Sequence, residues 1–318
     1  MKVIIFLGPT LPHELARAEC AATYVEPAAQ GDIYRAVAEE PFAIGLIDGY
    51  FERLPAVWHK EILWALKQGV HVFGAASMGA LRAAELARFG MRGVGEIFSA
   101  FEHGTLQDDD EVAVAHGDRD TGYRATSEAM VNIRATLRQA LEARVISEKT
   151  QAALVSLGKR LFYPDRSYPL LLARAPEVGC PPHEVEALRA FVAQHRVDQK
   201  RLDARALLLA VNACVARGTP PAPATFHFSH TEAWQGVVDW AARQPPFGVP
   251  EPLVSSQLAP AVEAGEVLRR YCRERLGREV PEQLEALLSD LSTAHRAALE
   301  TETLRESAYS RGTDDRVG

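Results

Sequence analysis

The chain has 318 residues, of which 47% are apolar, and a formal net charge of −7. This composition is sufficient for one large or two modest domains with a buried core. Lysines and arginines are scattered and form no basic stripe, which argues against nucleic-acid binding. No apolar run reaches the roughly 18–20 residues of a membrane helix, so we expect neither a nucleic acid nor a membrane as a partner.

The first residues predict a strand rather than a secretory signal, because Gly8-Pro9 ends the apolar run Val3–Leu7 too early. The four cysteines are far apart and form no CxxC motif, which is typical of reduced thiols in a cytoplasmic protein. His227 and His230 have ligand-like spacing, but no second pair of ligands lies nearby. We therefore expect no metal and no cofactor.

Strands and helices alternate over the first part of the chain. Apolar, β-branched runs predict buried strands, and periodic segments predict the helices between them. The predicted strands are Val3–Leu7, Ala43–Ile47 and Val70–Phe73, and the predicted helices are Leu11–Ala22, Asp32–Glu39, Ala56–Gln68 and Ser77–Phe89. Such alternation predicts an α/β fold with a small, mainly parallel sheet covered by helices. Val112–Val114 is a candidate edge strand.

The remainder of the chain is typical of helices separated by proline-rich connections. We divide the chain into an α/β core at 1–165 that holds the candidate active site, a helical region at 166–310, and a tail at 311–318. The polar, glycine-containing tail is expected to be disordered.

A serine and a lysine are predicted to meet at one edge of the sheet. Ser77 follows a strand, Lys60 begins the preceding helix, and loops at the carboxyl ends of parallel strands share an edge. A serine nucleophile needs a base, and burial near a helix N-terminus favours the neutral lysine that can act as one. We therefore predict Ser77 as the nucleophile and Lys60 as its base, with the backbone N–H groups of Met78 and Gly79 as the oxyanion hole.

Further residues at this edge are candidates for substrate binding, mostly because small side chains allow close approach of a substrate backbone. These residues are Gly8, Thr10, Asp48, Gly49, Gly74 and Arg82. Arg82 either steers a charged substrate or pairs with Glu85 three residues later. The acidic run Asp108–Glu111 is either a solvated turn or part of a docking surface for a partner.

Three alternatives remain open from the residues alone. Ser77 has the residue type and position of a helix N-cap, and Lys60 can be an ordinary solvated lysine. A Ser-Asp-His triad of Ser77, Asp108 and His116 has the chain order of α/β hydrolases.

Several motifs closely resemble the core of the TfuA-like family over roughly residues 30–165. They are Gly31-Asp32, Gly45–Phe51, Lys60–Ile62, Gly74–Glu85, Asp109–Val114 and Tyr123–Arg134. The block around Ser77 is long and specific.

The resemblance implies a role beside YcaO enzymes in peptide backbone thioamidation during RiPP biosynthesis. It implies a hydrolase that releases sulfide from the C-terminal thiocarboxylate of a ThiS-like carrier protein, using a Ser–Lys pair that Ser77 and Lys60 match best. YcaO, the carrier and, through YcaO, the precursor peptide would be the partners. The alternative is a non-catalytic adaptor that bridges the same three molecules, and a general esterase or amidase is a weaker third possibility.

Overall fold

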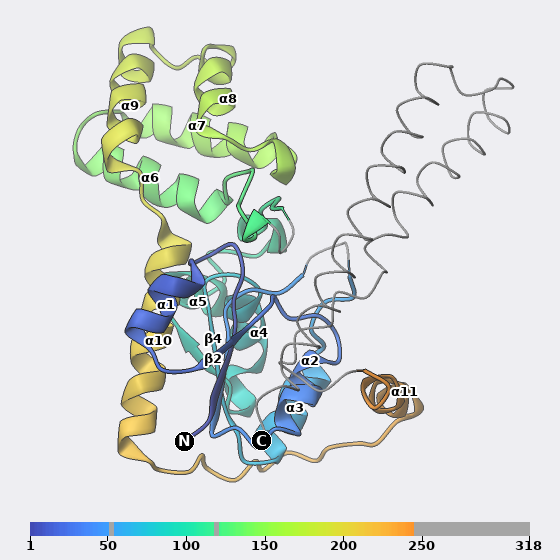
Figure 1. Cartoon of the computed structure of the whole chain (residues 1–318). Coiled ribbons are helices and arrows are strands. Elements are labelled where there is room, and N and C mark those ends of the chain that lie inside the picture. Colours follow the sequence, from blue (N-terminus) through green and yellow to red (C-terminus); the bar gives the residue numbers. More distant parts are fainter. Residues whose placement is uncertain (51–53, 118–120, 245–318) are drawn as a thin grey trace, which may run out of the picture. The chain divides into compact units, whose positions relative to one another are not determined.

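The computed structural model describes residues 1–50, 54–117 and 121–244. Its centre is a five-stranded, all-parallel sheet with the strand order β2-β1-β3-β4-β5 (Figure 1). The strands are β1 Val3–Phe6, β2 Thr23–Val25, β3 Ala43–Leu46, β4 His71–Ala75 and β5 Arg92–Val94. The predicted α/β class is confirmed.

The predicted apolar strands correspond to β1, β3 and β4. The end strand β5 and the predicted edge strand Val112–Val114 differ from expectation. The edge strand β5 was not predicted, because Arg92-Gly93-Val94 has neither an apolar run nor clear alternation. Val112–Val114 is not a strand of the sheet. The segment follows the 3₁₀ helix Asp109–Glu111 and lies beside the cavity described below.

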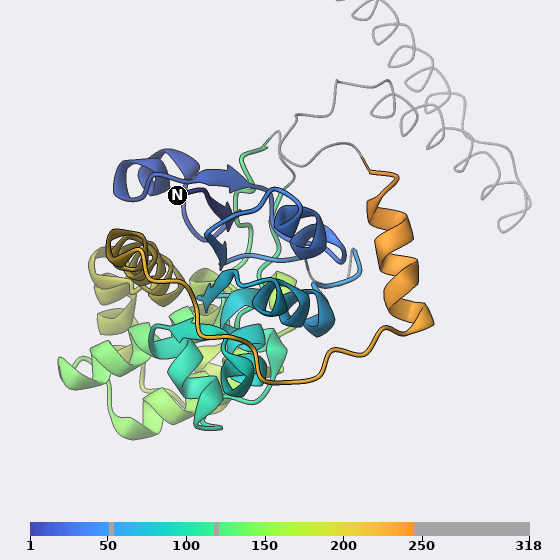
Figure 2. The same cartoon turned by 90° about the horizontal axis from the view of Figure 1, so that it is seen from below.

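Helices cover both faces of the sheet. Successive residues of a strand point to opposite faces, so the continuously apolar central strands present apolar side chains to both. Ile5 contributes to a core with α1 (His13–Glu19) and α10 (Gln199–Arg217), and the adjacent Ile4 contributes to a core with α2, α3 and α4. The bounds of the last three are Asp32–Val37, His59–Lys67 and Met78–Leu86. Figures 1 and 2 show α10 on one side of the strands and α2 and α3 on the other.

A second group of helices, α6 to α9, packs into a core of its own around Ile133, Leu137 and Leu154 (Figure 1). The group comprises α6 Met130–Glu142, α7 Glu148–Arg160, α8 Tyr168–Arg174 and α9 Pro182–His195. Along the chain, α5 at Glu96–Glu102 lies between the last strand and this group. Short 3₁₀ helices lie at Ala87–Phe89, Tyr163–Asp165 and Ala175–Val178. The expected boundary at residue 165 falls inside this helical group.

The chain then returns to the sheet through α10. Ala204, Leu207, Leu208 and Val211 of this helix are fully buried against the sheet residues. Part of the helical region expected at 166–310 therefore completes one face of the α/β core. This return is what brings α10 to the edge of the sheet where Ser77 lies.

The last described helix is α11, Glu232–Ala241. Trp234 of this helix packs against Tyr34, Trp64 and Phe228, which joins it to α2 and α3. Within the described ranges no helix has the length and apolarity to cross a membrane. The end of the expected helical region and the tail at 311–318 lie outside the described residues.

Candidate functional site

Ser77 lies on a tight turn between β4 and α4. The preceding residue, Ala76, has a φ of 67°, and the Ser77 N–H bonds to the Ala75 carbonyl at 2.8 Å. A positive φ is uncommon for a residue with a side chain, and such strained positions concentrate at functional sites. The turn presents Ser77 at the carboxyl edge of the sheet, where ligands bind in parallel α/β proteins.

The Ser77 side chain does not cap the helix that follows it. Ser77 occupies the N-cap position of α4, but its hydroxyl makes no capping hydrogen bond. Instead, Ser77 Oγ lies 3.1 Å from Lys200 Nζ, and both residues are buried. The simple helix-cap alternative therefore does not describe this serine.

Lys200 is held in place by groups from three segments. It is the second residue of α10, whose N-cap Asp198 accepts a hydrogen bond from the Arg201 N–H at 3.1 Å. The Lys200 N–H donates to Asn132 Oδ1 at 3.1 Å, and Lys200 Nζ donates to the Val112 carbonyl at 2.8 Å. These bonds fix both the backbone and the amine of the lysine beside Ser77.

The surroundings of Lys200 favour its neutral form. Burial lowers the pKa of the Lys200 ammonium, and the carboxylates of Asp48, Asp198 and Glu128 act in the opposite direction. The position at the N-terminus of a long helix adds to the lowering, because the positive end of the helix dipole disfavours a cation. A buried amine within hydrogen-bond distance of a serine hydroxyl satisfies the requirements for a general base.

The structure does not bring Lys60 to Ser77. Lys60 Nζ donates to Thr231 Oγ1 at 3.0 Å and lies over the rings of Trp58 and Phe228. At the start of α3 it is Glu61 that points inward, where it is fully buried and accepts the Trp58 N–H. The expected Lys60–Ser77 pairing is therefore replaced by Lys200–Ser77.

Sequence reasoning missed Lys200 because it lies 123 residues from Ser77 and beyond the recognised motifs. One local signal was present. Asp198 is a favoured N-cap residue directly before the helix Gln199–Arg217, so it places Lys200 in a first helical turn.

Asp48 organises the loop after β1 and makes no hydrogen bond to Lys60 in the described residues. Its carboxylate accepts bonds from the Gly8 N–H at 2.9 Å, the Thr10 N–H at 3.1 Å and the Thr10 hydroxyl at 2.6 Å. Gly8 and Thr10, predicted to bind substrate, therefore contact Asp48 directly. The resulting loop forms one side of the site and brings a buried carboxylate into the surroundings of Lys200.

Gly74 and Gly79 serve internal packing rather than a substrate groove. A Cβ on Gly79 would lie 1.8 Å from the Leu46 carbonyl oxygen, and one on Gly74 would lie 2.1 Å from the Gly79 oxygen. The Gly79 N–H donates to the Ile47 carbonyl at 3.2 Å, so it is not free for an oxyanion, contrary to the prediction. Among the described residues the Met78 N–H has no such partner and stays available.

Arg82 pairs with Glu85, the structural alternative to steering a charged substrate. It bonds to Glu85 at 2.7 Å and to the Val57 carbonyl at 2.9 Å, which ties α4 to the segment before α3. Gly49, by contrast, lines the cavity into which Ser77 opens.

The acidic run is largely neutralised by internal ion pairs. Asp110 pairs with Lys159 and Arg166, and buried Glu111 accepts two bonds from Arg134 at 2.8 Å. Asp110 and Glu111 are thus engaged within the fold rather than presented to a partner.

The Ser-Asp-His alternative is not assembled. The Asp108 carboxylate lies 3.1 Å from Lys159, and His116 Nδ1 bonds to the Gly117 carbonyl at 2.6 Å. His116 does line the same cavity as Ser77, but in the described structure the hydroxyl of Ser77 contacts Lys200.

The cavity at Ser77 is narrow, with a volume of about 140 Å³. It is lined by Pro9, Asp48, Gly49, Tyr50, Ser77, Val112, Ala113, Val114, Ala115, His116, Tyr163 and Pro164. Loops after β1, β3 and β4 contribute to it, together with the stretch 112–116.

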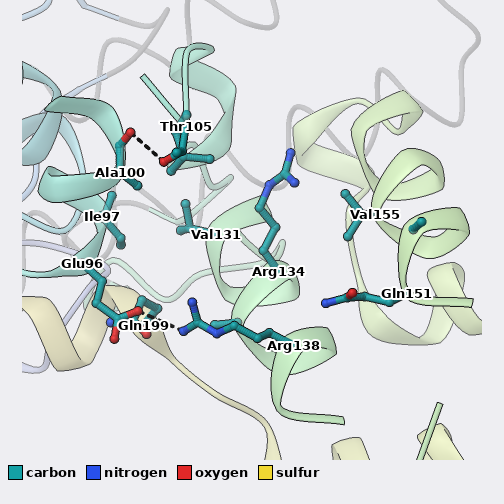
Figure 3. A pocket seen from close by; sticks show the side chains of 13 residues that line it. Glu96, Ile97, Ala100, Thr105, Val131, Arg134, Arg138, Gln151, Val155 and Gln199 are labelled. Carbon is teal, nitrogen blue, oxygen red and sulfur yellow. Dashed lines mark hydrogen bonds and ion pairs between the residues drawn. The ribbon is translucent and has the colours of Figure 1, made fainter. Parts of the chain in front are cut away.

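A larger cavity of about 460 Å³ lies between α5, α6 and α7. Figure 3 shows Arg134 and Arg138 on α6, with Gln151 and Val155 on the facing helix. Both arginines are already paired, with Glu111 and Glu96 respectively. Ser77 lines the smaller cavity and does not line this one, so the candidate site is at the smaller cavity.

The geometry defines an α/β protein with a buried serine–lysine pair at the carboxyl edge of a parallel sheet. A family model described as TfuA-like protein matches residues 48–167, and no curated protein matches the chain. The predicted classification is confirmed: this segment is TfuA-like. The match suggests an association with YcaO-type thioamidation. It includes Ser77 and ends before Lys200.

Proposed function

We propose that this protein is a Ser–Lys hydrolase that supplies sulfur for YcaO-dependent peptide thioamidation. Its substrate would be the C-terminal thiocarboxylate of a ThiS-like carrier protein, and its product sulfide. The observation that carries the proposal is the 3.1 Å contact between Ser77 Oγ and the buried Lys200 Nζ. Lys200 takes the role for which Lys60 was predicted.

In the first half-reaction, neutral Lys200 accepts the Ser77 hydroxyl proton while Oγ attacks the thiocarboxylate carbon. The free Met78 N–H is the available backbone donor to the developing oxyanion. The C–S bond then breaks, and Lys200 returns the proton to the departing sulfide. The carrier is left as an ester on Ser77.

In the second half-reaction, water replaces sulfide. Lys200 accepts a proton from the water as its oxygen attacks the ester carbon, and the C–Oγ bond breaks with the proton passing to Ser77. The carrier leaves as a carboxylate. Each cycle consumes one water and releases one sulfide without any change of oxidation state.

The test is sulfide release from a purified thiocarboxylated ThiS-like carrier. We expect Ser77→Ala and Lys200→Met to lose most of the activity, because each removes one member of the pair. Ser99→Ala is the matched control, since Ser99 is a half-buried serine of α5 whose hydroxyl lies 3.3 Å from His103 Nδ1 and which does not line the Ser77 cavity. Ser77→Ala with wild-type sulfide release would refute the hydrolase, and binding of carrier and YcaO without release would indicate the adaptor.

A further inference from the structure

One wall of the Ser77 cavity is a continuous stretch of backbone. Five consecutive residues, 112–116, line it, and the first of them is bonded to the catalytic lysine. A cavity wall of this kind offers backbone N–H and C=O groups as well as side chains.

Both ends of this stretch are fixed by hydrogen bonds. At one end the Val112 carbonyl accepts from Lys200 Nζ at 2.8 Å. At the other, the Ala115 N–H donates to Ser127 Oγ at 2.8 Å, and the Ala115 carbonyl accepts the Thr126 N–H at 2.7 Å. The stretch is thus held in place on either side of its centre.

The centre of the stretch has unused backbone groups. Within the part of the chain that the structure describes, the N–H and C=O groups of Ala113 and Val114 make no hydrogen bond. Ala113 is nevertheless only 4% exposed. Buried backbone polar groups are nearly always paired, and unpaired N–H and C=O groups can be satisfied by an added strand.

The cavity dimensions favour a narrow ligand. Its volume of about 140 Å³ is well below the roughly 300–1,000 Å³ of pockets that hold small-molecule ligands. Ala113 and Ala115 contribute only methyl groups to one wall, and Gly49 contributes no side chain to another. An extended chain of small residues fits such a space better than a compact metabolite does.

We propose that the C-terminal tail of the substrate binds beside this stretch as an added β-strand, paired through the N–H and C=O groups of Val114, which delivers its terminal acyl carbon to Ser77. The ligand class is an extended, glycine-rich peptide C-terminus. This inference rests on the proposed hydrolase and adds how the substrate is recognised. The Val112–Lys200 bond couples the wall that binds the tail to the base that acts on its end.

The experiment compares synthetic thiocarboxylates. The reference is a hexapeptide ending in Gly-Gly, and its analogues are methylated at one backbone nitrogen each, which removes a donor without altering the protein. We expect methylation at alternate nitrogens to lower kcat/KM by at least about 10-fold, since strand pairing uses every second residue on one edge. N-acetylglycine thiocarboxylate, which has no strand to add, should be similarly poor. Values within twofold for all substrates would overturn the proposal.

A binding measurement separates this proposal from the hydrolase itself. Ser77→Ala is titrated with fluorescent hexapeptide carboxylates, methylated and unmethylated. Tighter binding of the unmethylated peptide supports the added strand even if no substrate releases sulfide, and equal binding overturns it. On the protein side, Val114→Pro removes one N–H and should weaken binding about 10-fold, with Val114→Ala as the control that keeps it.

Discussion

Two lysines occupy equivalent positions in this chain and have opposite surroundings. Lys60 is the second residue of α3, and Lys200 is the second residue of α10. Lys60 is half-buried and bonds to Thr231, whereas Lys200 is buried and contacts Ser77. Position in a first helical turn is therefore insufficient to define a lysine base.

The two lysines differ because a different residue of the first turn faces the core in each helix. At the start of α3, Glu61 is buried and Lys60 points towards Thr231; at the start of α10, Lys200 is buried and Arg201 is exposed. Successive residues on a helix point about 100° apart, so only part of the first turn can face the core. Which residue faces inward is set by packing against the sheet.

The largest expected effect is a difference in kcat for sulfide release between the variants of these two lysines. Lys200→Met should lower kcat for sulfide release by about 10²- to 10⁴-fold, the range for loss of a general base. Lys60→Met should change kcat by no more than about twofold. Circular dichroism of both variants verifies folding, and equal losses in the two would contradict the assignment of the base.

A second expected effect concerns the buried group of α3. Burial raises the pKa of Glu61 from 4.5 to about 7. The Glu61 carboxyl therefore stays protonated to a higher pH in the folded state than in the unfolded chain. The free energy of unfolding falls as pH rises from 4.5 to about 7. A shift of this size corresponds to roughly 3 kcal/mol.

Glu61→Gln should remove this pH dependence, because glutamine retains a side-chain oxygen acceptor without ionising. We expect the variant to gain roughly 3 kcal/mol relative to wild type between pH 4 and pH 8. The measurement is urea unfolding of both proteins at the two pH values. A constant difference would show that Glu61 ionises normally.

The pH–rate profile tests the state of Lys200. Because burial lowers the pKa of Lys200, the active neutral form is reached below the usual lysine range near 10.4. We expect kcat to rise up to about tenfold per pH unit and then level off below that range. A rise that continues through pH 10 would indicate an ordinary lysine.

Much of the fold could be predicted from local patterns. The apolar runs Val3–Leu7 and Ala43–Ile47 define two central strands, because strands covered on both faces need continuous apolar sequence. The edge strand Arg92–Val94 is only partly buried, so it does not need a continuous apolar sequence and shows no pattern that predicts a strand. The role of α10 could not be predicted either, since tertiary packing decides which distant helix completes a sheet face.

The candidate site divides in the same way. Ser77 was predictable because its position after a strand and before a helix is a local property. Its partner was not, because Lys200 lies 123 residues later in the chain. Gly79 shows a further limit: its sequence context suits an oxyanion donor, but its N–H already bonds to Ile47.

A smaller effect is expected for the residue that positions the lysine. Asn132 Oδ1 accepts the Lys200 N–H at 3.1 Å and touches neither Ser77 nor the cavity. Asn132→Ala also removes the bonds from Asn132 Nδ2 to Glu128 Oε1 at 2.8 Å and to Asp198 Oδ1 at 3.1 Å. Because these bonds position Lys200 and the N-cap of its helix, their loss should lower kcat by about 3- to 10-fold and leave KM unchanged. An increase in KM with constant kcat would instead assign Asn132 to substrate binding.

The smallest expected effect returns to Lys60. Its contacts with Thr231 and with the rings of Trp58 and Phe228 join α3 to the segment that leads into α11. Lys60→Met should therefore cost about 0.5–1 kcal/mol of stability, the range for a partly exposed cation–π contact, without affecting the rate. Lys60→Arg is the matched control, since it retains the charge over the rings. If Lys60→Met loses activity while its stability is unchanged, the lysine of α3 takes part in the reaction and the contrast with Lys200 fails.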